Sequence, residues 1–217
     1  MLFETLASLL PGRFGLGVTR LKSEDAVYLT FDDGPHPVAT PRTLELLGKH
    51  CLTGTFFCLG EQLERHSKIA ATTLSEGHAL ANHSYDHTSF LRKNNTEILQ
   101  SLEKTRTLLA AMNSASSHIY RPPYGRITKR QAGTLSDEGY RLCMWSVMPG
   151  DYRKKRSVED MLGFIRKRLQ PGDIIVLHDN ENTAQELPDM ISGLADILDE
   201  KGLRSARITD EELSNDG

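Results

Sequence analysis

The stretch Thr30-Phe31-Asp32-Asp33-Gly34-Pro35 follows a short apolar run at residues 26–29 and sets two adjacent carboxylates at the end of a predicted strand. Two like charges this close resist joint ionisation, so a nearby cation is needed to keep both charged. The Gly-Pro pair stops the strand, because proline cannot donate to a strand ladder. An isolated Asp-Asp-Gly is usually a solvated turn. The residues that follow along the chain favour a compensated pair at the rim of a sheet.

The composition is that of one ordinary globular domain. The chain has 217 residues, of which 38% are hydrophobic and 25% are charged, enough for a full core. A net charge of −3 gives no indication of nucleic-acid binding, and the basic run at residues 153–156 is more typical of a solvated face. Three cysteines without a close Cys-x-x-Cys pair argue against a disulfide framework. No apolar run is long enough to cross a membrane.

Residues 1–10 predict a short amphipathic helix through the leucines at positions 2, 6, 9 and 10. This segment contains Glu4 and lacks a basic start and a small-residue cleavage site, so it is a poor signal peptide. We therefore expect a cytoplasmic protein, with an exported protein whose signal lies outside this sequence as the alternative. The predicted organisation is an N-terminal extension at residues 1–24, one domain at residues 25–210 and a C-terminal tail at residues 211–217.

Strand-like and helical patterns alternate along the domain. Repeated strand–helix units predict a parallel sheet with helices outside it in a single α/β domain. Seven units are too few for a regular eight-fold barrel but can close as a distorted (β/α)7-type barrel. The predicted strands are residues 27–31, 55–59, 78–81, 118–120, 141–147, 173–177 and 203–208. The predicted helices are residues 43–49, 62–74, 95–112, 158–169 and 186–198, the third with Asn94 or Asn95 as its N-cap.

Ionisable and aromatic residues recur at the ends of these strands. Asp32 and Asp33 follow the first strand, residues 82–87 follow the third, and residues 121–125 follow the fourth. Chemistry in parallel α/β folds gathers beyond the carboxyl ends of the strands. Delivery of such groups from several strands to one edge therefore predicts a functional site there.

His83 and His87 are four positions apart, which would place two imidazoles on one side of a helical turn. Two histidines and one carboxylate are a common catalytic zinc set. Two histidines at this spacing are weak support for a metal site by themselves. Together with Asp33 they favour metal binding over a purely structural role. The set accepts zinc or another divalent transition metal such as Co²⁺.

Five segments, taken in order, resemble the motifs of the polysaccharide deacetylase family, which shares the NodB-type homology domain and includes carbohydrate esterase family 4. The segments span nearly the whole domain, and any one of them alone would be weak support. They are residues 30–35, residues 83–87, residues 121–125, residues 145–151 and residues 177–179.

The resemblance implies a metal-dependent hydrolase that removes acetyl groups from sugars on a distorted (β/α) barrel. By position, Asp33, His83 and His87 would bind the metal. Asp32 would be the general base that deprotonates a metal-bound water, and His178 would be the general acid that protonates the leaving group. A histidine suits this role because its ordinary pKa is about 6.5.

The resemblance also implies supporting roles. Arg121 would pair with Asp32 and favour its charged form. Asp151 would orient His178. Trp145 and Leu177 would line the groove and the acetyl-methyl pocket, and the main-chain N–H of Tyr124 would stabilise the oxyanion.

The fourth motif departs from the family pattern at two positions. Met148 stands where relatives often carry an additional aspartate, and Tyr152 stands where they carry tryptophan. Because Asp151 is present, activity is expected to survive, while the wall of the groove differs.

The expected substrate is an acetylated glycan, either a peptidoglycan fragment or a chitooligosaccharide. The same hydrolysis of a small non-sugar amide or an O-acetyl ester is an alternative, and a non-catalytic carbohydrate-binding protein ranks last. No oligomeric state is predicted. Three further residues receive modest interpretations: His36 at the rim, Asp86 near the ligands or solvated, and Asp179 as a helix cap.

Overall fold

A computed structural model describes residues 17–153 and 156–214 of the chain. Strands alternate with helices throughout this part of the chain, as the sequence predicts. The strands are β1 (Ala26–Asp32), β2 (Thr55–Cys58), β3 (Ala79–Asn82), β4 (Ile119–Tyr120), β5 (Arg141–Leu142), β6 (Ile174–His178) and β7 (Arg204–Ala206). The helices are α2 (Ala39–Lys49), α3 (Gly60–Arg65), α4 (Ser67–Ser75), α5 (Asn95–Ala111), α6 (Lys129–Asp137), α7 (Val158–Arg168), α8 (Leu187–Lys201) and α9 (Asp210–Ser214), with short 3₁₀ turns η2 (Phe90–Arg92) and η3 (Pro123–Gly125).

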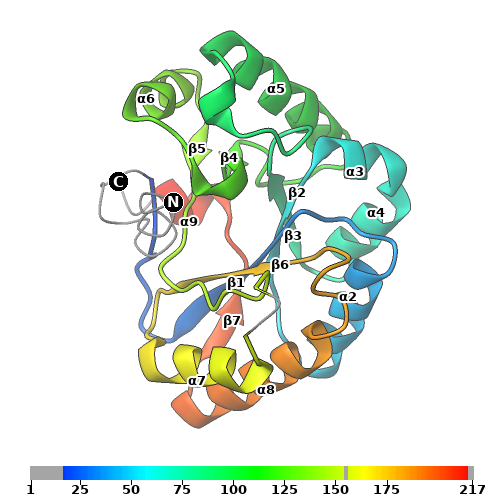
Figure 1. Cartoon of the computed structure of the whole chain (residues 1–217), viewed down its shortest axis with the longest axis vertical. Coiled ribbons are helices and arrows are strands. Elements are labelled where there is room, and N and C mark those ends of the chain that lie inside the picture. The colour runs from blue at the N-terminus through cyan, green and yellow to red at the C-terminus, as the bar shows by residue number, and fades with distance from the viewer. Residues whose placement is uncertain (1–16, 154–155, 215–217) are drawn as a thin grey trace.

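The strands form one parallel sheet in the order β5-β4-β3-β2-β1-β6, and β7 pairs with the first half of β1. Helices lie around the outside of this curled sheet, with α7 and α8 side by side along one side and α3, α4 and α5 along another (Figure 1). The predicted α/β fold, a distorted barrel of parallel strands in a single domain, is confirmed.

Residues 141–147 do not form the single strand that was predicted. Only the first two of them, β5, pair with β4. Cys143 still donates its N–H to the carbonyl of Tyr120 in β4 and bridges to Val18. The chain then crosses to the other edge of the sheet, where Val147 bridges to Ile175 of β6. An apolar run that reads as a strand is therefore a segment that connects the two edges and helps to close the barrel.

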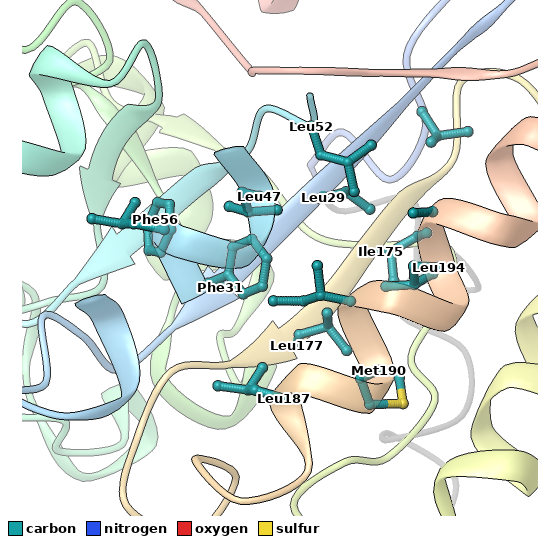
Figure 2. Close-up of a cluster of buried hydrophobic side chains, with 14 of the residues drawn as sticks. Leu29, Phe31, Leu47, Leu52, Phe56, Ile175, Leu177, Leu187, Met190 and Leu194 are labelled. Carbon is teal, nitrogen blue, oxygen red and sulfur yellow. The ribbon is translucent and has the colours of Figure 1, made fainter. Parts of the chain in front are cut away.

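The outer face of the central strands holds the larger hydrophobic core. Strand side chains alternate between the two faces of a sheet, so Leu29 and Phe31 of β1 share this face with Ile175 and Leu177 of β6 (Figure 2). They pack against apolar residues of α2 and α8, among them Leu47, Leu187, Met190 and Leu194. Each fully buried side chain of this kind contributes about 1.5–3 kcal/mol, so this face anchors the strands whose ends carry the site.

The inner face of the same strands combines a second apolar cluster with polar groups. Tyr28 of β1, Val176 of β6 and Phe57 of β2 belong to this cluster together with Trp145. Thr30 is two positions after Tyr28 on β1, so strand alternation places it on the same inner face. Its hydroxyl donates to the carbonyl of Ile175 at 2.8 Å. The interior of the barrel is therefore apolar at its base and becomes polar toward the carboxyl ends of the strands.

Helix boundaries follow identifiable local signals. Asn94 is the N-cap of α5, and its side chain and that of Glu97 form a reciprocal capping box, as the sequence favours. The helix predicted at residues 62–74 is in fact two, α3 and α4, because His66 between them has a non-helical backbone (φ −128°, ψ 38°). Helix α8 ends at Gly202 with a left-handed φ of 63°, the usual glycine stop.

The described parts of the predicted extension and tail pack on the domain. Val18 N–H donates to the carbonyl of Leu142, and Leu21 N–H donates to that of Gly172. Leu213 is buried in the inner cluster. The amphipathic helix predicted at residues 1–10 lies outside the described residues. Within the described part of the chain, no helix is both long and apolar enough to cross a membrane.

The three cysteines are free thiols, as predicted. Cys58 and Cys143 are buried, and Cys51 is exposed. Burial raises the pKa of Cys143 to about 11, which leaves its thiol inert at ordinary pH. Cys58 and Cys143 act as small hydrophobic side chains of the core.

Candidate active site

The predicted functional side chains meet at the carboxyl ends of the central strands. Asp32 ends β1 and His178 ends β6, and these two residues are register partners. His83 directly follows β3, and Arg121 directly follows β4, where its N–H donates to the carbonyl of Asn82. Parallel strands direct these ends to one edge, so the topology assembles the groups that the motif order predicts.

Asp33, His83 and His87 form a compact group with ligand atoms all within 4.8 Å of one another. Oδ1 of Asp33 lies 3.5 Å from Nε2 of His83 and 3.2 Å from Nε2 of His87. This oxygen is buried and has no hydrogen-bond partner among the described residues. A buried carboxylate oxygen without a partner is costly. Two imidazole nitrogens and one carboxylate oxygen are a donor set that fits a divalent transition metal.

The main chain fixes the tautomer of His83. Its Nδ1 lies 2.9 Å from the carbonyl oxygen of Arg121, which only accepts hydrogen bonds. Nδ1 therefore carries the hydrogen, and Nε2 presents its lone pair toward Asp33. Burial lowers the pKa of His83 to about 3. The imidazole is neutral near pH 7, which is the form that a metal ligand needs.

The helical turn predicted for residues 83–87 is wrong, because these residues form a loop. Ser84 and His87 have left-handed φ values of 71° and 55°. The buried Asn82 holds the loop: its Oδ1 accepts from the Ser84 N–H at 2.9 Å, and its Nδ2 donates to the carbonyl of Leu102 at 2.9 Å. The centroids of the two histidine rings are still only 5.2 Å apart. The loop therefore brings the two imidazoles together, as was expected of a helical turn.

Asp32 and Arg121 form a buried ion pair beside this group. Nη1 of Arg121 donates to Oδ1 of Asp32 at 2.7 Å, and the two side chains are 0% and 5% exposed. The other carboxylate oxygen, Oδ2, lies 4.0 Å from Nε2 of His83. One oxygen of Asp32 is thus engaged by a fixed cation, while the other faces the Asp33 group.

Arg121 satisfies its remaining donors within the barrel. It donates to the hydroxyl of Thr30 at 2.8 Å and to the main-chain carbonyls of Cys143 and Met144 at 3.2 Å and 2.8 Å. Its guanidinium group stacks 4.0 Å above the ring of Phe57. A buried ion pair is tolerated only when such additional bonds compensate its desolvation. The inner face of the barrel is therefore built around this arginine.

His178 has a carboxylate partner rather than a carbonyl. Asp151 accepts from the main-chain N–H of His178 at 2.6 Å and lies 2.9 Å from Nδ1 of the ring. Burial alone lowers the pKa of His178, but the charge and hydrogen bond of Asp151, with Asp32 and Asp33 nearby, raise it to about 9. Tyr152 packs edge-on against the imidazole, with ring centroids 5.3 Å apart. His178 is therefore held as a proton donor.

The predicted lining residues differ in exposure. Tyr124 is 61% exposed, and its ring lies 4.5 Å from that of His87. Its backbone is left-handed (φ 61°). Trp145 is almost fully buried and packs against Gly125, where a Cβ atom would lie 2.4 Å from the indole ring. Tyr124 thus belongs to the exposed wall of the site, and Trp145 supports that wall from below.

The placement of Leu177 does not support its predicted role in the groove. Its side chain is fully buried in the outer core, near Leu187 and Met190 (Figure 2). Strand alternation puts residue 177 on the face opposite to that of residue 178. Val176 shares the face of His178 and packs in the inner cluster, so it is the apolar residue of this strand on the side of the site.

Two residues near the site were missed or interpreted differently from sequence. Asp179 is not a helix cap: it is fully buried, and its Oδ2 accepts from the hydroxyl of Thr40 at 2.5 Å. Burial raises the pKa of Asp179 to about 7, which the Thr40 bond opposes and the charge of Asp33 assists. Asn180 donates from Nδ2 to Oδ2 of Asp33 at 2.8 Å. Adjacency to the motif at residues 177–179 is the only sequence signal for these contacts.

His36 and Asp86 have structural contacts. Nδ1 of His36 accepts from the N–H groups of Val38 and Ala39 at 3.3 Å and 3.1 Å, next to the start of α2. Asp86 accepts two bonds from Nζ of Lys93 at 2.8 Å and 3.0 Å. Neither residue belongs to the cluster at the strand ends.

Comparison with known proteins agrees with this architecture. Residues 20–143 match the family described as polysaccharide deacetylase. A chitooligosaccharide deacetylase of Azorhizobium caulinodans is 31% identical over 73% of this chain and 75% of its own length. A peptidoglycan-N-acetylglucosamine deacetylase of Bacillus cereus is 30% identical over 83% of this chain and 65% of its own length.

A solved structure shares the whole fold. It is that of a peptidoglycan N-acetylglucosamine deacetylase in complex with 4-naphthalen-1-yl-N-oxidanyl-benzamide, and it is 29% identical to this chain. The two superpose with a TM-score of 0.82 over 88% of this chain and 89% of the other. With the family match over more than half of its residues, the chain belongs to the polysaccharide deacetylase family of hydrolases.

Proposed function

We propose that this protein is a metal-dependent hydrolase that removes the acetyl group from an N-acetylated glycan of the peptidoglycan or chitooligosaccharide type. One observation carries the proposal. A ligand group of Asp33, His83 and His87 lies beside two separate proton-transfer candidates, Asp32 with its arginine and His178 with its aspartate. The names of the relatives supply the substrate class.

The chain offers a suitable metal site. Asp33 Oδ1 is buried without a partner among the described residues, and the lone pair of His83 Nε2 is directed toward it by the bond at Nδ1. Together with His87 these residues would hold Zn²⁺ or another divalent transition metal such as Co²⁺. A bound ion of this kind polarises a carbonyl oxygen and makes water more acidic.

Asp32 is suited to act as the general base. Its Oδ1 accepts a hydrogen bond from Arg121, and its Oδ2 is turned toward the ligand group. In this arrangement Oδ2 accepts the proton of the attacking water. Because Arg121 keeps all its donors in the barrel wall, the carboxylate stays in place when its charge changes.

His178 is suited to act as the general acid. It ends the strand that neighbours the strand of Asp32, so acid and base stand on adjacent strand ends. The bond between Nδ1 and Asp151 leaves Nε2 to deliver its proton to the leaving amine. A pKa near 9 keeps this proton in place until the bond to the leaving group breaks.

The exposed aromatic side chains suit a sugar. Tyr124 and Tyr152 are 61% and 40% exposed and lie against His87 and His178 respectively. One flat ring beside the ligand group and another beside His178 provide surfaces on which pyranose rings stack. The main-chain N–H of Tyr124 is the proposed donor to the tetrahedral oxyanion.

Acetate release tests the proposal. The protein is treated with a chelator, reloaded with Zn²⁺ or Co²⁺, and given chitooligosaccharides, peptidoglycan fragments, acetylated xylan and a small N-acetyl amide. Release from the first two substrates only after reloading is the expected result. Release only from xylan or from the amide would reassign the substrate, and no metal binding at all would overturn the proposal.

Replacement of the base separates catalysis from binding. Asp32→Asn is expected to retain metal and glycan binding and to lose about 10²–10⁴-fold in turnover. A matched control is Asp86→Asn, which removes an aspartate that pairs with Lys93 outside the cluster. Unchanged turnover of Asp32→Asn would remove Asp32 from the mechanism.

A further inference from the structure

The turn after β6 makes one contact with the ligand group that none of the assigned roles uses. Nδ2 of Asn180 donates to Oδ2 of Asp33 at 2.8 Å, across 147 positions of sequence. The two residues come from the ends of neighbouring strands, β6 and β1. The contact therefore joins the strand that carries His178 to the residue proposed to bind the metal.

The Asn180 bond engages one oxygen of Asp33 and leaves a single oxygen facing the histidines. The backbone of Asp33 is already fixed, with φ at 83° and its N–H donating to the carbonyl of Phe57 at 3.2 Å. Its carboxylate can still rotate, so that either one oxygen or both face the histidines. Because Asn180 engages Oδ2, Oδ1 is left toward His83 and His87, and Oδ1 is the oxygen without a partner among the described residues.

The orientation of the Asn180 amide is set from both ends. Its Oδ1 accepts from the N–H of Asn182 at 2.9 Å, while its NH₂ group faces the carboxylate of Asp33. A main-chain N–H only donates and a carboxylate only accepts, so a flipped amide would lose both bonds. The amide is therefore a fixed donor.

The turn is anchored independently of this amide. The N–H of Asp179 donates to the carbonyl of Asp32 at 2.7 Å, and its side chain accepts from Thr40. The hydroxyl of Thr183 donates to the carbonyl of His178 at 2.6 Å. Loss of the Asn180 amide should leave these bonds in place, so its contribution to folding and its contribution to the ligand group are separable.

We propose that Asn180 is a positioning residue that holds Asp33 as a ligand through one oxygen, Oδ1. The inference rests on the metal site of the proposed function and deepens it. Hydrogen-bonded partners of metal ligands fix ligand orientation, and their removal typically weakens metal binding by about 10–100-fold. Without the amide, both oxygens of Asp33 are free to turn toward the metal.

Metal titration of the Asn180 variants tests the inference. Asn180→Leu keeps approximately the volume of the side chain without its donor, and Asn180→Ala is the smaller alternative in case leucine disturbs folding. Asn182→Ala is the matched control, because its exposed side chain lies in the same turn while its bond to Asn180 comes from the main chain. Each chelated protein is titrated with Zn²⁺ against a chromophoric chelator, and the visible spectrum with Co²⁺ is recorded.

The expected result is Zn²⁺ binding about 10–100-fold weaker in both Asn180 variants, with wild-type affinity in the Asn182 control. The Co²⁺ spectrum should lose intensity as the coordination number rises, and the melting temperature of the chelated protein should change little. Wild-type affinity and spectrum in the Asn180 variants would overturn this inference alone. A wild-type protein that binds no metal would overturn both the inference and the proposed metal site, whereas normal metal binding without acetate release would count against the proposed reaction only.

Discussion

His83 and His178 stand at the ends of β3 and β6, and the same barrel holds them in opposite states. Burial lowers the pKa of His83 to about 3, where the nearby charge of Asp33 does not overcome it. Burial also acts to lower the pKa of His178, but Asp151 and the site carboxylates outweigh it and raise that pKa to about 9. Near pH 7 the His83 ring is therefore neutral and the His178 ring is protonated, although both side chains are largely buried.

The partner of Nδ1 accounts for much of the difference. For His83 this partner is the carbonyl of Arg121, a neutral dipole, and for His178 it is the carboxylate of Asp151. A carbonyl oxygen fixes the tautomer of the neutral ring but does little to stabilise a positive charge on it. A carboxylate fixes the tautomer and also stabilises the protonated ring. Titratable groups whose environments push their pKa values apart are candidates for acid and base roles. The contrast therefore supports the proposed roles of His83 as a neutral ligand and of His178 as a proton donor.

The largest expected effect is a loss of stability on replacing Arg121, whose carbonyl accepts the hydrogen bond from His83 and whose side chain pairs with Asp32. Arg121→Leu leaves the carboxylate of Asp32 and two main-chain carbonyls buried without their donor. The free energy of unfolding should fall by about 3–5 kcal/mol, measured by urea denaturation of the chelated protein.

An exposed ion pair provides the control for this variant. Arg106 pairs with Glu103 on the surface, with 30% and 52% of the two side chains exposed. Arg106→Leu should cost only about 0.2–1 kcal/mol. Equal losses in the two variants would contradict the view that Arg121 organises the barrel interior.

The next effect comes from making the His178 side resemble the His83 side. Asp151→Asn replaces the carboxylate at Nδ1 by a neutral amide, so His178 should lose its stabilised proton and its fixed orientation. We expect kcat to fall about 100-fold, at the low end of what general acid catalysis supplies. Metal affinity should remain, because His178 lies outside the ligand group. The control is Asp160→Asn, which changes an exposed aspartate in the first turn of α7. A kcat of Asp151→Asn within twofold of wild type would exclude the proposed action of Asp151 on the general acid.

A smaller effect should appear in the pH dependence of stability. The pKa of His178 is raised in the folded protein from 6.5 to about 9, so its contribution to stability is complete below pH 6.5 and is lost as the pH rises through 9. After allowance for the partial exposure of the ring, this contribution is on the order of 2 kcal/mol. Urea denaturation of chelated wild type and Asp151→Asn between pH 6 and pH 10 measures it. The difference between the two curves should shrink with rising pH, and parallel curves would contradict the assigned shift.

Much of this arrangement could be predicted because parallel strands direct their carboxyl ends to one edge. The positions of Asp32, His83, Arg121 and His178 relative to strand ends were enough to predict that they meet. Side-chain direction was the weaker point: Leu177 was expected in the groove, although its position next to His178 already implies the opposite face of the strand.

Other features depend on contacts between distant segments that no local pattern encodes. The loop at residues 83–87 takes its shape from the buried Asn82 and its bond to α5. Residues 141–147 look like a strand by apolarity, but their partners, Val18 and Ile175, lie on different segments. Asn180 is an ordinary turn residue in the sequence, and only the pairing of β1 with β6 brings it to Asp33.

The smallest expected effect concerns the aromatic side chain beside the acid. Tyr152 is 40% exposed and packs edge-on against His178. We expect its uncharged ring to offer contact area to a bound glycan. Tyr152→Ala should raise KM for a glycan by about 2–10-fold, the equivalent of about 0.5–1.5 kcal/mol of ring contact, while kcat changes little. Tyr152→Phe keeps the ring and should behave as wild type, and Leu91→Ala controls for loss of an exposed apolar side chain elsewhere. A fall in kcat without a change in KM would instead mean that Tyr152 acts through His178, and the comparison between the two histidines would then have to include their aromatic neighbours.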